Sequence, residues 1–282
     1  MIKTIVVAGA GTMGSGIALV CARAGFKTIL YDVNSEILAR SRAYINESLG
    51  QLVRKGKMMK EASDEILTTF IFTSDPADCV ADVIIEAIVE KPAAKIALFN
   101  QLAQINSAGC LFATNTSSIA VSLLQQSIIN PHRVAGMHFF NPAPVMKLVE
   151  VVVGDQTSDS TVTSIYELCL ALDKMPVVCK DSPGFIVNRI ARHYYLQAMK
   201  IAEAGIASIE DIDEIMESTG FKMGPFKLMD LIGMDVNLAV SQGIYESFNH
   251  AERFVPASMQ IEKVKAGELG KKSGKGFYDY SS

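Results

Sequence analysis

One carboxylate and one imidazole near the middle of the sequence could act together as an acid–base pair. Glu150 is the only carboxylate in an otherwise apolar predicted strand, 146–153. Burying an unpaired polar group costs about 2–7 kcal/mol, and a charge more, so Glu150 needs a partner. His138 ends the preceding predicted strand, and the chain turns back at 141–144. A carboxylate that orients an imidazole makes it a better base. Without Glu150, His138 would be interpreted as a core histidine.

A polar cluster, Asn115-Thr116-Ser117-Ser118, directly follows the apolar run 110–114. Ligands of open α/β sheets lie beyond the carboxyl ends of the strands, which makes this cluster a candidate binding site. The alternative is that Ser117 or Ser118 only caps the helix that follows.

The run Gly9-Ala10-Gly11-Thr12-Met13-Gly14 has the G-x-G-x-x-G pattern and stands between an apolar strand and a helical pattern that stops near Gly25. Gly9 allows a tight turn, Gly11 lets the backbone approach a pyrophosphate, and Gly14 lets helix and strand pack closely. The pyrophosphate would meet unpaired N–H groups and the positive end of the helix dipole. A plain strand-to-helix turn is the alternative.

Asp32 strengthens the dinucleotide interpretation because it ends the second apolar run, 21 residues after Gly11. Its carboxylate can accept hydrogen bonds from a ribose diol and would repel a 2′-phosphate. We therefore expect NAD rather than NADP as the cofactor.

The elements that position these residues follow from the alternation of short apolar runs and helical patterns up to residue 182. Such alternation predicts an α/β fold with a Rossmann-type, doubly wound, mostly parallel sheet. The predicted strands are 3–8, 27–31, 70–73, 82–86, 110–114, 133–138, 146–153 and 175–179.

After residue 182 almost everything is predicted to be helical, so we expect an NAD-binding domain at 1–182 and an all-helical domain at 183–282. Ser182 suits a helix N-cap and Pro183 the first helical position. The second domain is rich in Leu, Ile and Met, which indicates a partner surface. The predicted helices are 184–203, 208–218, 225–230, 235–248 and 256–266.

A charged stretch at about 34–69 interrupts the alternation and predicts an inserted long helix with a helical return. Its middle holds Arg54, Lys55 and Lys57. Cations favour the negative pole at a helix C-terminus, so a solvated helix end explains them. The alternative is an anionic ligand bound there.

Composition excludes several classes of protein. A formal net charge of −4 gives no field suited to nucleic acid, and no apolar run is long enough to span a membrane. Five dispersed cysteines predict free thiols in a reducing compartment, and neither they nor the four histidines form a metal motif. Because the first predicted strand begins almost at Met1, we expect no targeting segment in this chain and a cytoplasmic location.

Together these motifs resemble those of the L-3-hydroxyacyl-CoA dehydrogenases, and most of all the short bacterial 3-hydroxybutyryl-CoA dehydrogenases. The resemblance covers essentially the whole chain. It rests on Gly9–Gly14, Asn115–Ser118, HFFNP at 138–142, VMKLVEV at 145–151, PGFIVNR at 183–189, Met223-Gly224-Pro225 and KSGKGFY at 272–278.

The resemblance implies NAD-dependent interconversion of (S)-3-hydroxyacyl-CoA and 3-oxoacyl-CoA, with His138 as acid–base and Glu150 orienting it. It implies that Ser117 and Asn188 bind the substrate's oxygens. Cofactor contacts are implied for Glu90, Lys95, Ser117, Asn141 and Lys272. For Glu90 and Lys95, a solvated pair at a helix start is the alternative from the residues alone.

The resemblance also gives the cationic stretch a ligand, since Ser48 and Lys55 match positions that contact coenzyme A. A cation typical of the family is replaced here by Gln51. The helical domain of the family forms a homodimer. Two other functions remain open: a dehydrogenase of a free hydroxy acid or sugar acid, and a non-catalytic NAD-binding protein that would leave Glu150 unexplained.

Overall fold

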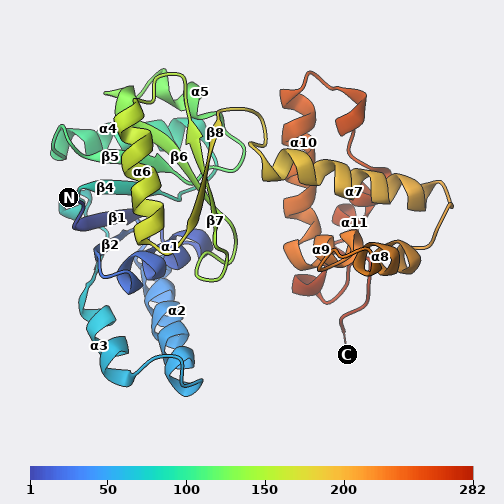
Figure 1. Cartoon of the computed structure of the whole chain (residues 1–282), viewed down its shortest axis with the longest axis horizontal. Coiled ribbons are helices and arrows are strands. Elements are labelled where there is room, and N and C mark those ends of the chain that lie inside the picture. The colour runs from blue at the N-terminus through green and yellow to red at the C-terminus, as the bar shows by residue number, and fades with distance from the viewer. Residues whose placement is uncertain (282) are drawn as a thin grey trace. The chain divides into compact units, whose positions relative to one another are not determined.

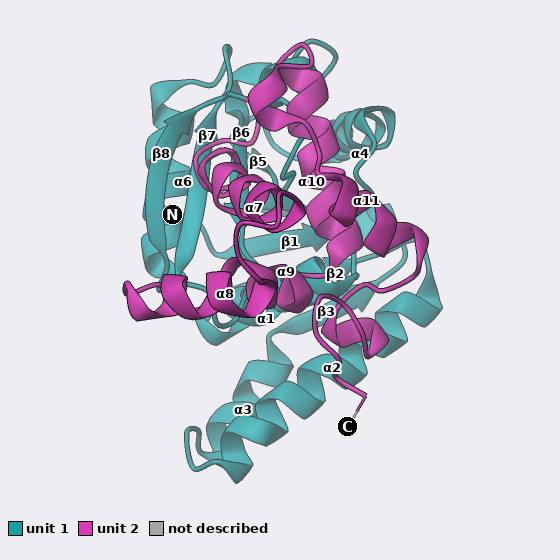
Figure 2. Cartoon of the chain, turned by 90° about the vertical axis from the view of Figure 1, so that its right-hand side faces the viewer, with its two compact units in different colours: residues 1–182 teal, residues 183–282 magenta. Residues whose placement is uncertain are grey.

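The computed structural model describes residues 1–281, and the chain divides into two compact units, Met1–Ser182 and a second that begins at Pro183 (Figure 2). We call them unit 1 and unit 2. No helix in the described part of the chain has both the length and the apolar character needed to cross a membrane. All five cysteines are free, and four of them are buried.

Unit 1 is built on one eight-stranded sheet with the order β3-β2-β1-β4-β5-β6-β7-β8. Strands β1 to β6 run parallel, β7 runs antiparallel to β6, and β8 runs parallel to β7. This confirms the doubly wound, mostly parallel sheet. All eight predicted strands are present, with ends shifted by at most two residues: β1 Thr4–Ala8, β2 Lys27–Tyr31, β3 Phe70–Thr73, β4 Val83–Glu86, β5 Leu111–Thr114, β6 Val134–Phe139, β7 Leu148–Val153 and β8 Met175–Lys180.

Helices cover both faces of this sheet. One core cluster joins the buried sides of α1, α2 and α6 to β1, β4 and their neighbours. On the opposite face α4 packs against β5, where the rings of Phe99 and Phe112 meet edge to face at 5.3 Å. The helices are α1 Thr12–Arg23, α2 Ser35–Arg54, α3 Lys60–Thr68, α4 Pro92–Ile105, α5 Val121–Gln125 and α6 Asp159–Ala171, with short 3₁₀ turns at Pro76–Asp78 and Pro131–Arg133.

The expected insertion is present as α2 and α3, which extend beyond the sheet of unit 1 in Figure 1. Asn34 caps α2 by accepting from the N–H groups of Glu36 and Ile37. The helix ends at Arg54, and Gly56 follows with a left-handed φ of 65°. A long helix and a helical return were predicted here, and both are confirmed.

Unit 2 is helical, as expected, and its apolar side chains form a core of their own. The hydroxyl of Ser208 caps α8, and Pro225 begins α9. The helices are α7 Val187–Glu203, α8 Ile209–Ser218, α9 Pro225–Ile232, α10 Met234–Ser247 and α11 Ser258–Lys265, with 3₁₀ turns at Glu252–Phe254 and Lys271–Ser273.

The predicted start of the first helix of unit 2 is wrong. A turn starts at Pro183, directly after Ser182, and α7 begins only at Val187. Gly184 and Phe185 have φ values of 73° and 47°, and this left-handed backbone cannot continue a right-handed helix. The Arg189 N–H bonds back to the carbonyl of Gly184 across this turn. Pro183 therefore begins a turn.

Candidate active site

The carboxyl ends of β1 to β6 lie along one edge of the sheet, and β7 starts at this edge because it runs antiparallel to β6. The order of strands reverses between β1 and β4. Ligands of open α/β sheets bind at such a reversal. The glycine turn follows β1, Glu90 follows β4, Ser117 follows β5, and His138 is the last residue but one of β6. The sheet therefore gathers these predicted residues at one edge.

The glycine turn is shaped so that only glycine fits at two of its positions. Gly9 has a φ of 104°, and a Cβ there would lie 2.5 Å from the carbonyl oxygen of Ala87. A Cβ on Gly14 would lie 1.7 Å from the carbonyl oxygen of Gly9. At Gly11, by contrast, a Cβ would meet nothing within 4 Å, which leaves room for a ligand beside the start of α1. This cradle fits a dinucleotide pyrophosphate.

Asp32 is held beside this turn. One of its carboxylate oxygens accepts from the N–H of Ala10 at 2.8 Å and the other from the N–H of Asn34 at 2.9 Å. These two bonds fix the carboxylate next to the turn, at the carboxyl end of β2. That is the position from which a carboxylate recognises the ribose of NAD.

His138 and Glu150 are paired residues in the β6–β7 register. The imidazole Nδ1 donates to Oε2 of Glu150 at 2.7 Å, and the side chains are only 7% and 1% exposed. The ring of Phe140 lies 4.6 Å from the imidazole. In the neutral ring the proton sits on Nδ1, so Nε2 carries the lone pair. The geometry is that of a general acid–base held in one tautomer.

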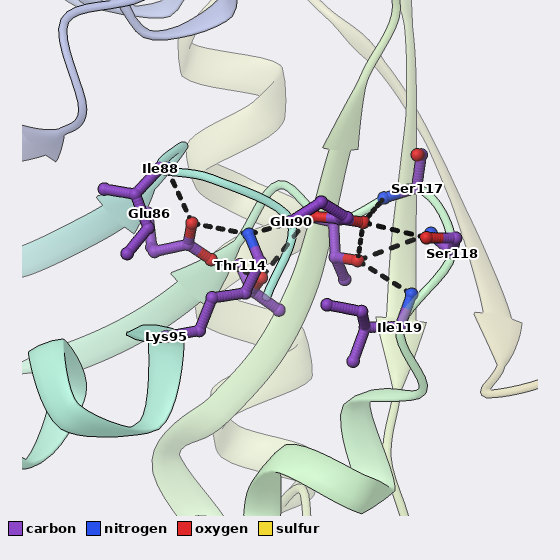
Figure 3. Close-up of polar contacts among 9 residues, drawn as sticks. Glu86, Ile88, Glu90, Lys95, Thr114, Ser117, Ser118 and Ile119 are labelled. Carbon is purple, nitrogen blue, oxygen red and sulfur yellow. Dashed lines mark hydrogen bonds and ion pairs between the residues drawn. The ribbon is translucent and has the colours of Figure 1, made fainter. Parts of the chain in front are cut away.

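Glu90 and Lys95 are not a solvated pair. Lys95, in the first turns of α4, is 1% exposed, and its ammonium lies 2.6 Å from a Glu86 carboxylate oxygen and 3.0 Å from one of Glu90 (Figure 3). Burial alone would raise the pKa of Glu90, but the Lys95 charge and several hydrogen bonds outweigh it and hold that pKa below its usual value. The alternative of a solvated helix start is wrong because Glu86 draws Lys95 into the core.

The alternative in which Ser117 or Ser118 only caps the following helix is also wrong. Ala120 precedes α5 with no side-chain cap, and it is the hydroxyl of Thr116 that accepts from the N–H groups of Ser118 and Ile119. The same Thr116 hydroxyl donates to Glu90. The loop therefore takes its shape from a turn and from a long-range carboxylate rather than from a helix cap.

Several predicted residues lie outside this edge of unit 1 or in unit 2. Ser48 is in α2 and Lys55 is the C-cap residue of that helix, about two helical turns further along and so on the same face. Asn141, by contrast, is at this edge, exposed in the β6–β7 loop. Asn188 is in the first turn of α7, and Lys272, in the turn Lys271–Ser273, forms an ion pair with Asp235. The last two belong to unit 2.

Sequence reasoning missed two residues that organise the site, Glu86 and Thr114, and gave Asn115 no structural role of its own. The Glu86 carboxylate accepts from Lys95 and from the Thr114 hydroxyl, and Oδ1 of Asn115 accepts from the N–H of Phe139 at 2.8 Å, which ties β5 to the strand of His138. Glu86 is the only carboxylate in the apolar run 83–86. Glu150 was recognised by the same pattern, so Glu86 could also have been recognised from the sequence.

Comparison with known proteins identifies the family. The model of the 3-hydroxyacyl-CoA dehydrogenase NAD-binding domain matches residues 4–182, and the model of the C-terminal domain of the same family matches 184–280. The chain belongs to the 3-hydroxyacyl-CoA dehydrogenase family. It is an oxidoreductase, and its cofactor is NAD, which agrees with the cradle at Gly11 and with Asp32.

Similar proteins are found across the family. The chain is 46% identical to 3-hydroxyadipyl-CoA dehydrogenase of Escherichia coli over 99% of its own length but only 59% of that protein's. It is 41% identical to a probable 3-hydroxybutyryl-CoA dehydrogenase of Deinococcus radiodurans, over 97% of this chain and 99% of that one. The crystal structure of (S)-3-hydroxybutyryl-CoA dehydrogenase from Ralstonia eutropha superimposes with a TM-score of 0.95, at 37% identity and full coverage of both chains.

Within residues 1–281 no three histidine, cysteine, aspartate or glutamate side chains are grouped so that they could hold a metal ion.

Proposed function

We propose that this chain interconverts short (S)-3-hydroxyacyl-CoA and 3-oxoacyl-CoA thioesters, such as 3-hydroxybutyryl-CoA and acetoacetyl-CoA. The observation that carries the proposal is the buried pair of His138 and Glu150, 2.7 Å apart at the carboxyl edge of the sheet. Hydride transfer at a carbon that bears a hydroxyl group needs a partner for the hydroxyl proton, and this pair provides one. Relatives named for 3-hydroxybutyryl-CoA support the choice of short chains.

Held by the glycine turn and Asp32, the cofactor would supply the hydride acceptor for carbon 3 in oxidation and the hydride donor in reduction. In oxidation, Nε2 of His138 takes the proton of the 3-hydroxyl as its O–H bond breaks. In reduction the imidazolium returns that proton to the 3-keto oxygen. Glu150 keeps Nδ1 protonated throughout and stabilises the positive ring that forms after proton transfer. Because Glu150 is buried, its charge is poorly screened by water, so this stabilisation is strong.

The remaining predicted residues bind substrate and cofactor in this proposal. The glycine turn 9–14 and Asp32 hold the two ends of the pyrophosphate–ribose unit, and Glu90, Lys95, Ser117, Asn141 and Lys272 line the rest of the cofactor. Ser117 and Asn188 hold the substrate's oxygens. Ser48 and Lys55 of α2 bind the coenzyme A portion, whose phosphates are anionic. Arg54 forms an ion pair with Glu47 at 2.5 Å. Neither Lys55 nor Lys57 forms an ion pair in the part of the chain described.

We further propose a cytoplasmic homodimer formed through unit 2, acting in fatty-acid or butyrate metabolism. Unit 2 exposes large apolar side chains that a partner would cover, including Ile206, Ile215, Phe221 and Leu231.

The first test is the oxidation of NADH, followed by absorbance, with acetoacetyl-CoA as the substrate. Free acetoacetate and NADPH are run in parallel. We expect rapid turnover only with the thioester and NADH together, because the proposed site binds coenzyme A and Asp32 repels a 2′-phosphate. Turnover with the free acid but not with the thioester would contradict the proposal.

A further inference from the structure

A chain of alternating charges, Glu86, Lys95 and Glu90, runs from the end of β4 to the loop that carries Ser117 (Figure 3). Glu86 is 0% exposed and Lys95 is 1% exposed. A buried ion pair of this kind adds little net stability, because the loss of hydration of two charges offsets their attraction. The proposed proton and hydride transfers do not involve Glu86. The series of buried charges that begins at Glu86 therefore needs another explanation.

Glu86 is fixed on every side. Its Oε1 accepts from the Lys95 ammonium at 2.6 Å and from the N–H of Ile88 at 2.7 Å, and its Oε2 accepts from the Thr114 hydroxyl at 2.7 Å. Burial raises the pKa of Glu86, and the charge of Lys95 opposes that rise. The result is an anchored carboxylate at the end of β4 that no substrate can reach.

Lys95 connects Glu86 to Glu90. Its ammonium touches Glu86 on one side and Oε2 of Glu90, 3.0 Å away, on the other. The Glu90 side chain is 38% exposed, so within residues 1–281 Glu86 is the only fully buried carboxylate paired with the ammonium. Removing the charge of Glu86 would leave a buried cation balanced by one partly solvated carboxylate, and the ammonium would then shift.

Glu90 uses its other oxygen to organise the loop. Oε1 accepts from the Thr116 hydroxyl, from the N–H of Ser117 at 3.1 Å and from the Ser118 hydroxyl at 3.1 Å. In Figure 3 the backbone nitrogen of Ser117 faces Glu90, while its hydroxyl points the other way. Glu90 thus holds the backbone of Ser117 on the side away from its hydroxyl. This bond fixes the direction in which the hydroxyl points.

We propose that Glu86 is a positioning residue, which through Lys95 fixes Glu90 and through Glu90 fixes the backbone of Ser117. The inference rests on the proposed function, in which the Ser117 hydroxyl binds the substrate. Displacement of a substrate-binding group by about 1 Å can cost on the order of 100-fold in rate, so a buried residue behind the site can matter to turnover.

The test is a double-mutant cycle between Glu86→Gln and Ser117→Ala, measured with acetoacetyl-CoA at saturating NADH. Glutamine keeps the size of Glu86 and an acceptor for Lys95 but removes the charge. In the presence of Ser117 we expect Glu86→Gln to lower kcat/KM about 10-fold. In the Ser117→Ala background we expect a loss of less than about twofold, because no hydroxyl remains to be positioned.

Arg133→Met is the matched control, since it removes another buried cation of unit 1, which donates to the carbonyls of Ser107 and Cys110. It should lower the midpoint of thermal unfolding and leave kcat/KM within about twofold. Equal losses from Glu86→Gln in both backgrounds, in an active enzyme, would overturn the positioning role alone. If Glu86→Gln does not fold, Thr114→Val, which removes the hydroxyl bonded to Oε2 of Glu86, is put through the same cycle, with the same two outcomes. A wild-type enzyme without turnover would overturn the proposed function and this inference with it.

Discussion

In the proposed mechanism, the bond between His138 and Glu150 decides which imidazole nitrogen exchanges a proton with the substrate. Glu86 is the same kind of residue in the same kind of strand, a lone carboxylate among apolar neighbours, yet its partner is the ammonium of Lys95. An ammonium holds its proton at neutral pH, whereas an imidazole exchanges it. The same signal in the sequence therefore leads to two different roles, and the partner determines which one applies.

At this scale we predict that His138→Gln lowers kcat by about 10²–10⁴-fold, the usual contribution of a general acid–base. Glutamine can still bond to Glu150, so NADH binding, measured by fluorescence titration, should change by less than about twofold. The matched control is His132→Gln, which alters an exposed histidine in the turn before β6 and should leave turnover intact. Unchanged kcat in His138→Gln would refute the role proposed for the imidazole.

At the scale of elements, local sequence patterns were enough to predict a strand or turn wherever its structure depends only on its own residues. The central strands β1, β4, β5 and β6 are apolar runs with almost all side chains buried, and the glycine turn is specified by its own backbone, so both could be predicted. The start of α7 could not, because the left-handed backbone at Gly184 and Phe185 has no local signature strong enough to outweigh Pro183. The burial of Lys95 depends on Glu86, nine residues earlier on β4, and no local pattern reveals that contact.

The α2 helix offers the element-scale prediction. Reversing the two unpaired cations at its end, with Lys55→Glu and Lys57→Glu, should raise KM for acetoacetyl-CoA about 10-fold while kcat stays within about twofold, because coenzyme A is anionic and the chemistry lies elsewhere. Added salt should raise the wild-type KM and reduce the difference between the two proteins.

The control for charge is Arg23→Glu with Lys27→Glu, which reverses two exposed cations at the end of α1 and the start of β2. It has the same net charge as the α2 variant and should leave KM unchanged. Equal KM values for the wild type and the α2 variant would favour a dehydrogenase of a free hydroxy acid, since such a substrate needs no coenzyme A clamp.

At the scale of the whole molecule, two buried carboxylates explain how unit 2 keeps its C-terminal segment in place. Asp213 accepts from the N–H of Phe226 and from the hydroxyl of Tyr278. Asp230 accepts from the N–H groups of Phe277 and Tyr278. Both carboxylates are fully buried, so the segment that carries Lys272 is anchored to α8 and α9. Unit 2 can therefore present a rigid helical surface to a partner.

We expect that surface to pair two chains. Ile206, Ile215, Phe221 and Leu231 are at least half exposed in a single chain, and covering apolar area of this kind favours association. Light scattering should give twice the 30.5 kDa mass of one chain. Because a chain can pair with a second chain only when it is folded, the midpoint of thermal unfolding should rise with protein concentration. NADH should raise that midpoint at every concentration, since it binds the folded state of unit 1. A single-chain mass at concentrations of tens of micromolar, with an unfolding midpoint that does not depend on concentration, would rule out the dimer while leaving the catalytic proposal intact.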